Sequence, residues 1–199
     1  MITDLFSIPI FKKKYEGDLE IIKSSVIPKI DKLVDEYDCT NFPNMINGAL
    51  CSYAKPFNIE SWTELNPVIS LVTTCIKEYT HTLKVNKNLS LVQDSSWISL
   101  YPPNAYLDLH AHDKVGIATV FYLQKPLNSG NLILKNNFSI WSHYKQHNDI
   151  EVVNNEELVF EVEEGDIVMF PGFLLHGTQP NLSNDNRIII GCDFKFTRK

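Results

Sequence analysis

Two histidines one residue apart, followed far downstream by a third, form the pattern in this sequence with the clearest chemical meaning. His110 and His112 lie close together, and His176 comes much later. If residues 107–112 form a strand, side chains two positions apart point to the same side, so both imidazoles project together. His176 could then close a facial metal site. Imidazole binds iron, zinc, copper and nickel alike, so the histidines by themselves do not name the metal.

The complete ligand set stays open at this point. Non-haem Fe(II) oxygenases typically bind iron through two histidines and one carboxylate on one face, which leaves other positions free for substrate and oxygen. The expected His-x-Asp pair is His110-Ala111-His112 here. Either His112 replaces the carboxylate in a three-histidine centre, or a nearby acid completes the triad. Asp108 shares the predicted strand face with both histidines, and Asp113 qualifies only if the strand ends there.

An arginine follows the third histidine at a spacing that suits an anionic cosubstrate. Arg187 stands eleven residues beyond His176 and opens the apolar run 188–190. A buried arginine is costly unless an anion meets it, and its planar guanidinium binds a carboxylate through two parallel hydrogen bonds. We interpret Arg187 as the residue that binds a dicarboxylate, with a structural salt bridge as the alternative. Tyr101 could donate its hydroxyl to the same anion or serve as a core tyrosine.

Helices and an edge strand are expected in the first part of the chain. Residues 18–37 place apolar side chains at helical spacing, although Pro28 should kink this helix or split it into two. Residues 61–83 are the clearest helix, with Thr63 as a cap and His81 favourably placed near its C-terminus. Residues 5–11 alternate loosely and include a proline, which favours an edge strand or an extended arm.

Beyond residue 88 the pattern changes to short β-type runs separated by turn residues. Many short strands without intervening helical patterns are typical of a sandwich or barrel. We therefore predict a mainly β fold with N-terminal helices and a double-stranded β-helix (jelly roll, cupin-like) core. One domain should span residues 1–199, with residues 1–88 as a helical support layer with edge strands and residues 89–199 as the jelly-roll core. The predicted strands are 96–101, 106–112, 117–123, 131–135, 158–162, 166–170 and 187–196.

Composition narrows the classes of function. A chain of 199 residues is long enough to bury a full core, and its net charge of -6 provides no general attraction to nucleic acid. Four widely spaced cysteines without a Cys-x-x-Cys pair indicate free thiols in a reducing compartment. No apolar run approaches bilayer length, and the N-terminus lacks a signal-peptide pattern. We expect a soluble cytoplasmic protein without a membrane partner, and we keep a homodimer as a hypothesis.

The ordered set of motifs resembles the 2-oxoglutarate- and Fe(II)-dependent dioxygenase superfamily, and more closely a group of such oxygenases common in bacteriophages and bacteria. The segments that carry the resemblance are Leu5–Ile10, Trp97–Tyr101, His110–His112, Phe121–Pro126 with Gly130, Gly165–Pro171, His176, Pro180–Asn181 and Arg187. The chain departs from the pattern at Ile189 for a usual serine, at Asp193 for a usual asparagine, and at Ala118-Thr119 for Ser-Gly.

This resemblance implies a jelly roll that binds iron through His110, His112 and His176 and 2-oxoglutarate through Arg187. It also implies that 2-oxoglutarate is decarboxylated to succinate and CO2 as O2 is split and a C–H bond is hydroxylated. A phage-encoded protein of this kind would act in the host cytoplasm.

Two other classes of function stay open. A cupin-like metal enzyme that does not use 2-oxoglutarate suits the three-histidine pattern, and pairing of Arg187 with Asp193 or Asp185 would favour it. A non-catalytic jelly roll could instead serve as a structural or binding protein, for instance in virion assembly. Fold alone does not separate these classes, since jelly rolls host all of them.

Overall fold

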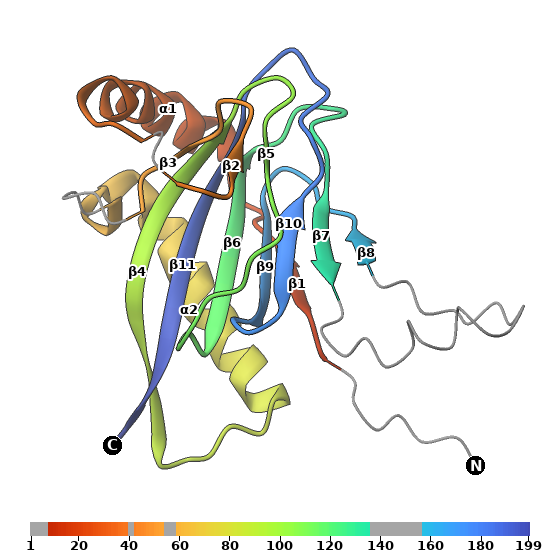
Figure 1. Ribbon diagram of the computed structural model, residues 1–199. Coiled ribbons are helices and arrows are strands. Elements are labelled where there is room, and N and C mark those ends of the chain that lie inside the picture. Colours follow the sequence, from red (N-terminus) through yellow and green to blue (C-terminus); the bar gives the residue numbers. More distant parts are fainter. Residues whose placement is uncertain (1–7, 40–41, 54–58, 136–156) are drawn as a thin grey trace, which may run out of the picture.

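The computed structural model describes residues 8–39, 42–53, 59–135 and 157–199, which form three β-sheets, of six, three and two strands, and two long helices (Figure 1). The helices are α1 (Leu19–Glu36) and α2 (Asn66–Thr82), and short 3-10 turns cover Ile59–Ser61 and Thr63–Leu65. The strands are β1 (Phe11–Lys14), β2 (Met45–Ile46), β3 (Leu50–Cys51), β4 (Leu89–Tyr101), β5 (Tyr106–Leu107), β6 (Ile117–Gln124), β7 (Leu132–Lys135), β8 (Glu157–Phe160), β9 (Asp166–Pro171), β10 (Leu175–Thr178) and β11 (Arg187–Arg198).

The strands form the predicted jelly roll. A six-stranded sheet in the order β1-β9-β6-β11-β4-β3 is accompanied by a three-stranded sheet, β10-β7-β8, and by the short pair β2-β5. All of these pairings are antiparallel. The prediction of a mainly β fold with N-terminal helices is therefore confirmed.

Two buried clusters of side chains pack on opposite faces of the sheet whose central strand is β11. Because side chains alternate along a strand, even-numbered residues of β11 face one side of the sheet and odd-numbered residues face the other. Ile188 and Ile190 pack with residues of both helices in one buried cluster. Ile189 packs with residues of β7 and β9 in a second cluster, between the sheets. The odd-numbered face of β11 thus looks into the jelly roll.

Helix α1 runs without a break through Pro28, so the predicted split into two helices is wrong. The Asp18 side chain caps its start by accepting a hydrogen bond from the Ile21 amide. Pro28 lies on the exposed face, where the carbonyl that loses its partner remains accessible to water. Tertiary packing of one face outweighs this local loss. The residues that bury that face are Ile22, Val26, Ile30 and Leu33.

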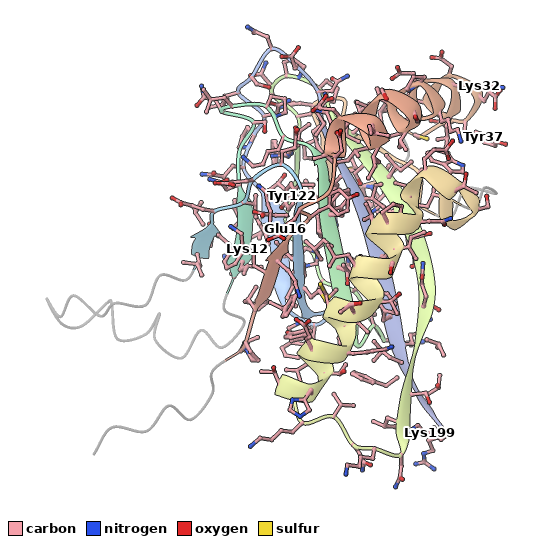
Figure 2. All side chains as sticks on the ribbon, turned by 180° about the vertical axis from the view of Figure 1, so that it is seen from behind. Lys12, Glu16, Lys32, Tyr37, Tyr122 and Lys199 are labelled. Atoms are coloured by element: carbon pink, nitrogen blue, oxygen red, sulfur yellow. The ribbon has the colours of Figure 1, made fainter. Side chains whose placement is uncertain are left out.

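Helix α2 starts later than the sequence predicts. The helix begins at Asn66, and Thr63 belongs to a 3-10 turn, so the predicted Thr63 cap is wrong. Pro67 in the first turn explains the start, because its fixed φ suits the first helical positions. His81 lies in the last turn, as expected. Seen from behind, α2 crosses the outer face of the larger sheet (Figure 2).

Most of the seven strands predicted beyond residue 88 are confirmed to within a few residues, and the structure adds the short strands β2, β3 and β10 to them. The predicted edge strand over residues 5–11 is displaced, because the strand observed at the sheet edge is Phe11–Lys14, and residues 1–7 lie outside the described part of the chain. Lys12 and Lys14 form ion pairs with Asp166 and Glu163.

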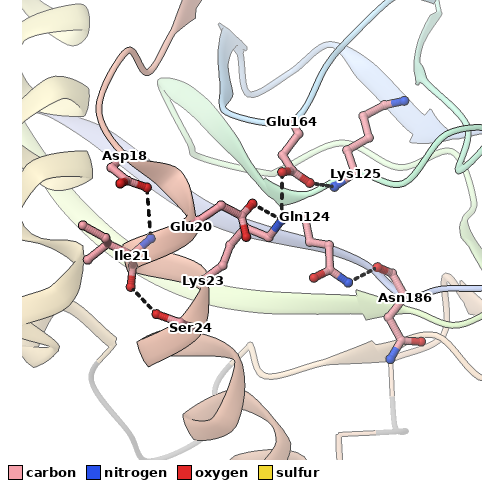
Figure 3. A network of polar contacts seen from close by, with 9 residues as sticks. All are labelled: Asp18, Glu20, Ile21, Lys23, Ser24, Gln124, Lys125, Glu164 and Asn186. Atoms are coloured by element: carbon pink, nitrogen blue, oxygen red, sulfur yellow. Dashed lines mark hydrogen bonds and ion pairs between the residues drawn. The ribbon is translucent and has the colours of Figure 1, made fainter.

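A polar network ties α1 to the ends of two sheet strands (Figure 3). Lys23 of α1 donates to one Glu164 oxygen at 2.9 Å, and the other Glu164 oxygen accepts from the Lys125 amide at 2.9 Å. Gln124, the last residue of β6, donates to the Asn186 carbonyl at 2.8 Å. The start of β11 is thereby held beside the end of β6.

None of the four cysteines, all of which the structure describes, forms a disulfide. In the described part of the chain, no helix is both long and apolar enough to cross a membrane.

Truncation of Ile30 tests the packing of α1 on the sheet. Ile30 is fully buried on α1, whereas Ile21 on the same helix is 65% exposed. Ile30→Ala should lower the free energy of unfolding by about 2–5 kcal/mol, and Ile21→Ala by about 0.5 kcal/mol or less. Urea denaturation followed by circular dichroism measures both. Equal losses in the two variants would contradict the observed burial of α1.

Candidate metal centre

The three predicted histidines meet between the sheets. His176 lies on β10, and His110 forms an isolated antiparallel bridge with it through two backbone hydrogen bonds of 2.9 Å. The His112 amide donates to the Gly172 carbonyl at 2.9 Å. The predicted continuous strand over residues 106–112 is wrong, since β5 ends at Leu107 and the chain beyond it is held by these separate contacts.

Gly177 explains how the histidine segment can approach β10 so closely. A Cβ atom added at Gly177 would lie 2.8 Å from the Leu107 carbonyl oxygen and 3.3 Å from the Asp108 backbone. Any larger residue there would push away the segment that carries His110. The glycine next to His176 is therefore part of the local structure that brings the two histidines together.

The imidazoles form a compact cluster. The ring centroids are 4.3 Å apart for His110 and His176, 5.0 Å for His110 and His112, and 4.9 Å for His112 and His176. One ring nitrogen from each lies within 4.8 Å of those of the other two, and the Nε2 atoms of His110 and His112 are 3.1 Å apart. Phe170 packs edge-on against His176 at 4.6 Å and helps to bury it.

Hydrogen bonds on the far side of each ring determine which nitrogen is free. The Nδ1 atoms of His110 and His176 face the carbonyl oxygens of Asp108 and Leu174 at 3.1 and 2.8 Å. The Nδ1 atom of His112 faces an Asp193 carboxylate oxygen at 2.8 Å. Carbonyl and carboxylate oxygens accept hydrogen bonds, so each Nδ1 carries the hydrogen. Each neutral ring then presents an Nε2 lone pair to the cluster.

Burial favours the neutral form of His110 and His176. Desolvation lowers the pKa of His176 well below its ordinary value, and the neighbouring His110 lowers it further. Desolvation and the nearby His112 likewise lower the pKa of His110. Neutral imidazole is the form that binds metals.

The donor set fits a single metal ion. Converging lone pairs repel one another unless a cation lies between them. Two imidazole nitrogens bound to one ion at about 2.1 Å, with an angle near 90–110°, lie about 3.0–3.4 Å apart. The 3.1 Å separation of the His110 and His112 Nε2 atoms agrees with this geometry.

No carboxylate joins the cluster among the described residues. Asp108 is exposed, and its side chain accepts a hydrogen bond from the Leu109 amide at 2.8 Å, while His110 contacts only its backbone carbonyl. Asp113 is exposed at the rim of the cavity. The geometry therefore favours the three-histidine alternative over a triad completed by either acid.

Asp193 is the acid beside the centre. The sequence interpretation considered it as a partner for Arg187 and as a departure from a usual asparagine, but not as a neighbour of the histidines. It lies on β11, is 2% exposed, and bonds to His112. The sequence signal that could have placed Asp193 near the site was its spacing from Arg187. Arg187, Ile189 and Asp193 all occupy odd-numbered positions of one strand and therefore share a face. A charged residue in such an apolar strand is costly without a partner.

Arg187 and Tyr101 lie opposite each other on β11 and β4, so the structure brings these two predicted residues together. The guanidinium carbon of Arg187 lies 4.3 Å from the centre of the Tyr101 ring. Its Nη1 donates to the Ser129 and Gln179 carbonyls, and its Nη2 donates to the Thr178 hydroxyl at 2.8 Å. Arg187 itself stands behind the cavity wall, to which Thr178 contributes.

Arg187 is a buried cation without an anionic partner among the residues that the structure describes. It is 1% exposed, its Nε has no hydrogen-bond partner, and no described carboxylate pairs with it. Burial lowers the pKa of its guanidinium. The Tyr101 hydroxyl is also buried and has no hydrogen-bond partner among the described residues, and burial raises its pKa to about 12. Unpartnered polar atoms beside a buried cation suit an anionic ligand.

A cavity of about 360 Å³ opens beside the histidines, a volume typical of small-molecule sites. The described residues that line it include no lysine or arginine. An aromatic wall runs outward from His112, with ring-centroid distances of 5.7 Å to Trp97, then 5.4 Å to Tyr53 and 5.6 Å to Phe42. This aromatic wall was not predicted from the sequence.

The wall depends on Gly191. A Cβ atom added at Gly191 would lie 2.3 Å from the Trp97 indole. The glycine on the inner face of β11 thus leaves the space that the indole occupies.

Comparisons with known proteins agree with the fold. Residues 95–193 match the family model described as "Putative 2OG-Fe(II) oxygenase". No curated protein matches the sequence. Among solved structures, a Pseudomonas putida prolyl-4-hydroxylase is similar with a TM-score of 0.63 and 14% identity, over 97% of this chain and 94% of that one.

Two further structures show the same fold. The viral collagen prolyl hydroxylase of Paramecium bursaria Chlorella virus-1, in complex with 2-oxoglutarate, has a TM-score of 0.54 and 14% identity, over 93% of this chain and 94% of that one. HygX of Streptomyces hygroscopicus, with nickel and 2-oxoglutarate bound, has a TM-score of 0.56 and 11% identity, over 94% and 83%.

Removal of the Tyr101 hydroxyl tests whether this group is unpartnered in the ligand-free protein. Tyr101→Phe should leave the free energy of unfolding unchanged or slightly higher, because no hydrogen bond is lost. Tyr79→Phe is the matched control, since the buried Tyr79 hydroxyl donates to the Pro9 carbonyl at 2.7 Å. It should lose about 0.5–1.5 kcal/mol in urea denaturation. A comparable loss in Tyr101→Phe would show that its hydroxyl is already bonded within the protein.

Proposed function

This chain belongs to the 2OG-Fe(II) oxygenase family through residues 95–193, and we propose that His110, His112 and His176 hold its iron. The convergence of three imidazole nitrogens within 4.8 Å is the observation that carries this proposal. Their Nδ1 hydrogens point outward to oxygen acceptors, which leaves three nitrogen donors for one ion. Three protein ligands leave other coordination positions for ligands and oxygen.

Arg187 is the proposed binding residue for the 2-oxoglutarate carboxylate that lies away from the iron. Support comes from its burial without a carboxylate partner and from its link to Thr178 in the cavity wall. The Thr178 hydroxyl accepts from Arg187 and from the Leu107 amide, so its own hydrogen is free to be donated. Tyr101, whose hydroxyl is unpartnered among the described residues, is the proposed second donor.

Bound iron and 2-oxoglutarate would supply the oxidation: 2-oxoglutarate would lose CO2 and take up one atom of O2 to become succinate, and the other atom would be inserted into a C–H bond of the substrate. The protein's own residues position these reactants. Imidazoles fixed by hydrogen bonds hold the metal without reorganisation. The largely apolar cavity wall limits the access of water, and Trp97, Tyr53 and Phe42 offer flat surfaces to a substrate.

The alternative of a cupin-like enzyme without 2-oxoglutarate depended on Arg187 pairing with an acid of the protein. Neither Asp193 nor Asp185 forms that pair: Asp193 contacts His112, and Arg187 donates to carbonyls and a hydroxyl. The family match favours the oxygenase over a non-catalytic structural or binding role.

Several finer statements stay predictions from the sequence. A cytoplasmic location, a phage origin and a homodimer are among them. We also infer that residues 1–199 act as one domain. Both helices share a buried cluster with strands β4, β6, β9 and β11, which supports this inference.

Removal of His176 tests the metal assignment. His176→Ala should lose iron, because a two-imidazole site lacks one of its three protein ligands. We expect Fe(II) affinity to fall at least about 10–100-fold in anaerobic equilibrium dialysis. His81→Ala is the control, since His81 is exposed in the last turn of α2. Circular dichroism of both metal-free variants checks folding. Unaltered iron binding in folded His176→Ala would remove this residue from the site.

Removal of Arg187 tests the cosubstrate assignment. Arg187→Ala should weaken 2-oxoglutarate binding to the iron-loaded, anaerobic protein by about 1.5–3 kcal/mol, the size of a charge-assisted hydrogen bond. Metal content should not change. Isothermal titration calorimetry measures the affinity, and Arg198→Ala, at the exposed end of the same strand, is the control. Arg187→Lys keeps the charge if the alanine variant unfolds. Wild-type affinity in folded Arg187→Ala would contradict the assignment, and so would the absence of any loss in both folded variants.

Catalysis is tested by Fe(II)-dependent conversion of 2-oxoglutarate to succinate, with O2 consumption recorded in parallel. The wild-type protein should form succinate in step with O2 uptake, even as slow uncoupled turnover without a substrate. His176→Ala should form none. Iron binding without any succinate would argue for a metal-binding jelly roll without oxygenase activity.

A further inference from the structure

Asp193 stands behind one of the three histidines in a position that the metal ligands alone do not explain. Its carboxylate oxygen lies 2.8 Å from the His112 Nδ1. The residue is 2% exposed, and its side chain hydrogen-bonds to His112 and to no lysine or arginine in the part of the chain that the structure describes. Lys195, two positions along the strand, instead pairs with Asp94 at 2.7 Å.

Strand alternation aims Asp193 at the centre. It shares the odd-numbered face of β11 with Ile189, and both line the cavity. Phe194, the next residue, packs on the opposite face in the cluster between the sheet and the helices. The register between β11 and β4 shifts beside Asp193, where Asp193 pairs with Ser95 and Phe194 with Gln93. The unpaired residue at this shift belongs to β4, so the alternation of β11 continues unchanged through Asp193.

A buried carboxylate without a lysine or arginine partner is expensive, and among the described residues the Asp193 carboxylate hydrogen-bonds to an imidazole. A neutral hydrogen-bond acceptor such as a carbonyl satisfies Nδ1 in both other histidines. Only His112 has a carboxylate behind it, and only His112 stands where the His-x-Asp pattern has its anionic ligand. Three neutral imidazoles would leave the metal centre without the negative charge that this ligand provides.

We propose that Asp193 is a positioning residue that supplies this missing charge through His112. The carboxylate holds the His112 hydrogen on Nδ1, orients the ring, and makes Nε2 a stronger donor to the metal. In the His-x-Asp pattern the negative charge belongs to a metal ligand. In this protein it belongs to Asp193, the hydrogen-bond partner of a ligand. This inference rests on the proposed function, because it takes His112 as a metal ligand.

Co(II) binding to the anaerobic protein tests the proposal without catalysis. Asp193→Asn keeps the size and a hydrogen-bond acceptor but removes the charge, and Asp193→Ser removes the contact as well. We expect Co(II) dissociation constants about 10–100-fold above wild type for Asp193→Asn, and at least as high for Asp193→Ser. Asp94→Asn, the same change on neighbouring β4 away from the site, should stay within about two-fold, since exposed ion pairs contribute little.

The cobalt absorption spectrum separates positioning from simple structural damage. Asp193→Asn should retain the band pattern of a three-nitrogen site at saturating Co(II), whereas His112→Ala should lose it. Thermal melting of the metal-free variants identifies which of them are folded. The Co(II) affinity of either folded Asp193 variant then decides whether Asp193 strengthens metal binding.

Two failures are distinguishable. If His112→Ala binds Co(II) like the wild type, the proposed ligand set is wrong. If His112→Ala weakens binding but both Asp193 variants match Asp94→Asn, the ligand set stands and the role of Asp193 is overturned.

Discussion

The hydrogen bonds on the outer sides of three imidazoles are the constraint on which this site depends. Each Nδ1 is committed to an oxygen acceptor, so each Nε2 lone pair points toward the others. Mutually facing acceptors need a cation between them. The protein is thereby organised for a metal before any metal binds, and the two backbone bonds between His110 and His176 hold two of the rings in register.

Strand β11 carries both charged residues of the site, Arg187 and Asp193. Arg187 begins β11 and Asp193 lies six residues later on the same face, with Ile189 between them. The buried cation proposed for 2-oxoglutarate and the buried anion behind His112 are therefore fixed by a single backbone, which pairs with β4 and β6 on either side. The helices contribute by covering the other face, where Ile188 and Ile190 pack. The alternation of side chains along β11 therefore determines both the packing against the helices and the geometry of the site.

The sequence was informative where local pattern determines structure. Alternation and turn residues predicted the β-rich region, and the spacing of His110, His112 and His176 identified the cluster. The failures have tertiary causes. Burial of one helix face outweighs Pro28, and the close approach at Gly177 holds the His110 segment without a regular strand. Asp193 acquires its role only when strand pairing places it beside His112, a contact between residues 81 positions apart.

Anomalous diffraction from crystals loaded anaerobically with Co(II) tests the central claim most directly. The account predicts a single strong peak between the sheets, about 2.1 Å from the Nε2 atoms of His110, His112 and His176. It also predicts that all three Nδ1 atoms keep their present acceptors. A peak bound by fewer than three of these nitrogens, or a metal held elsewhere in the protein, would contradict it.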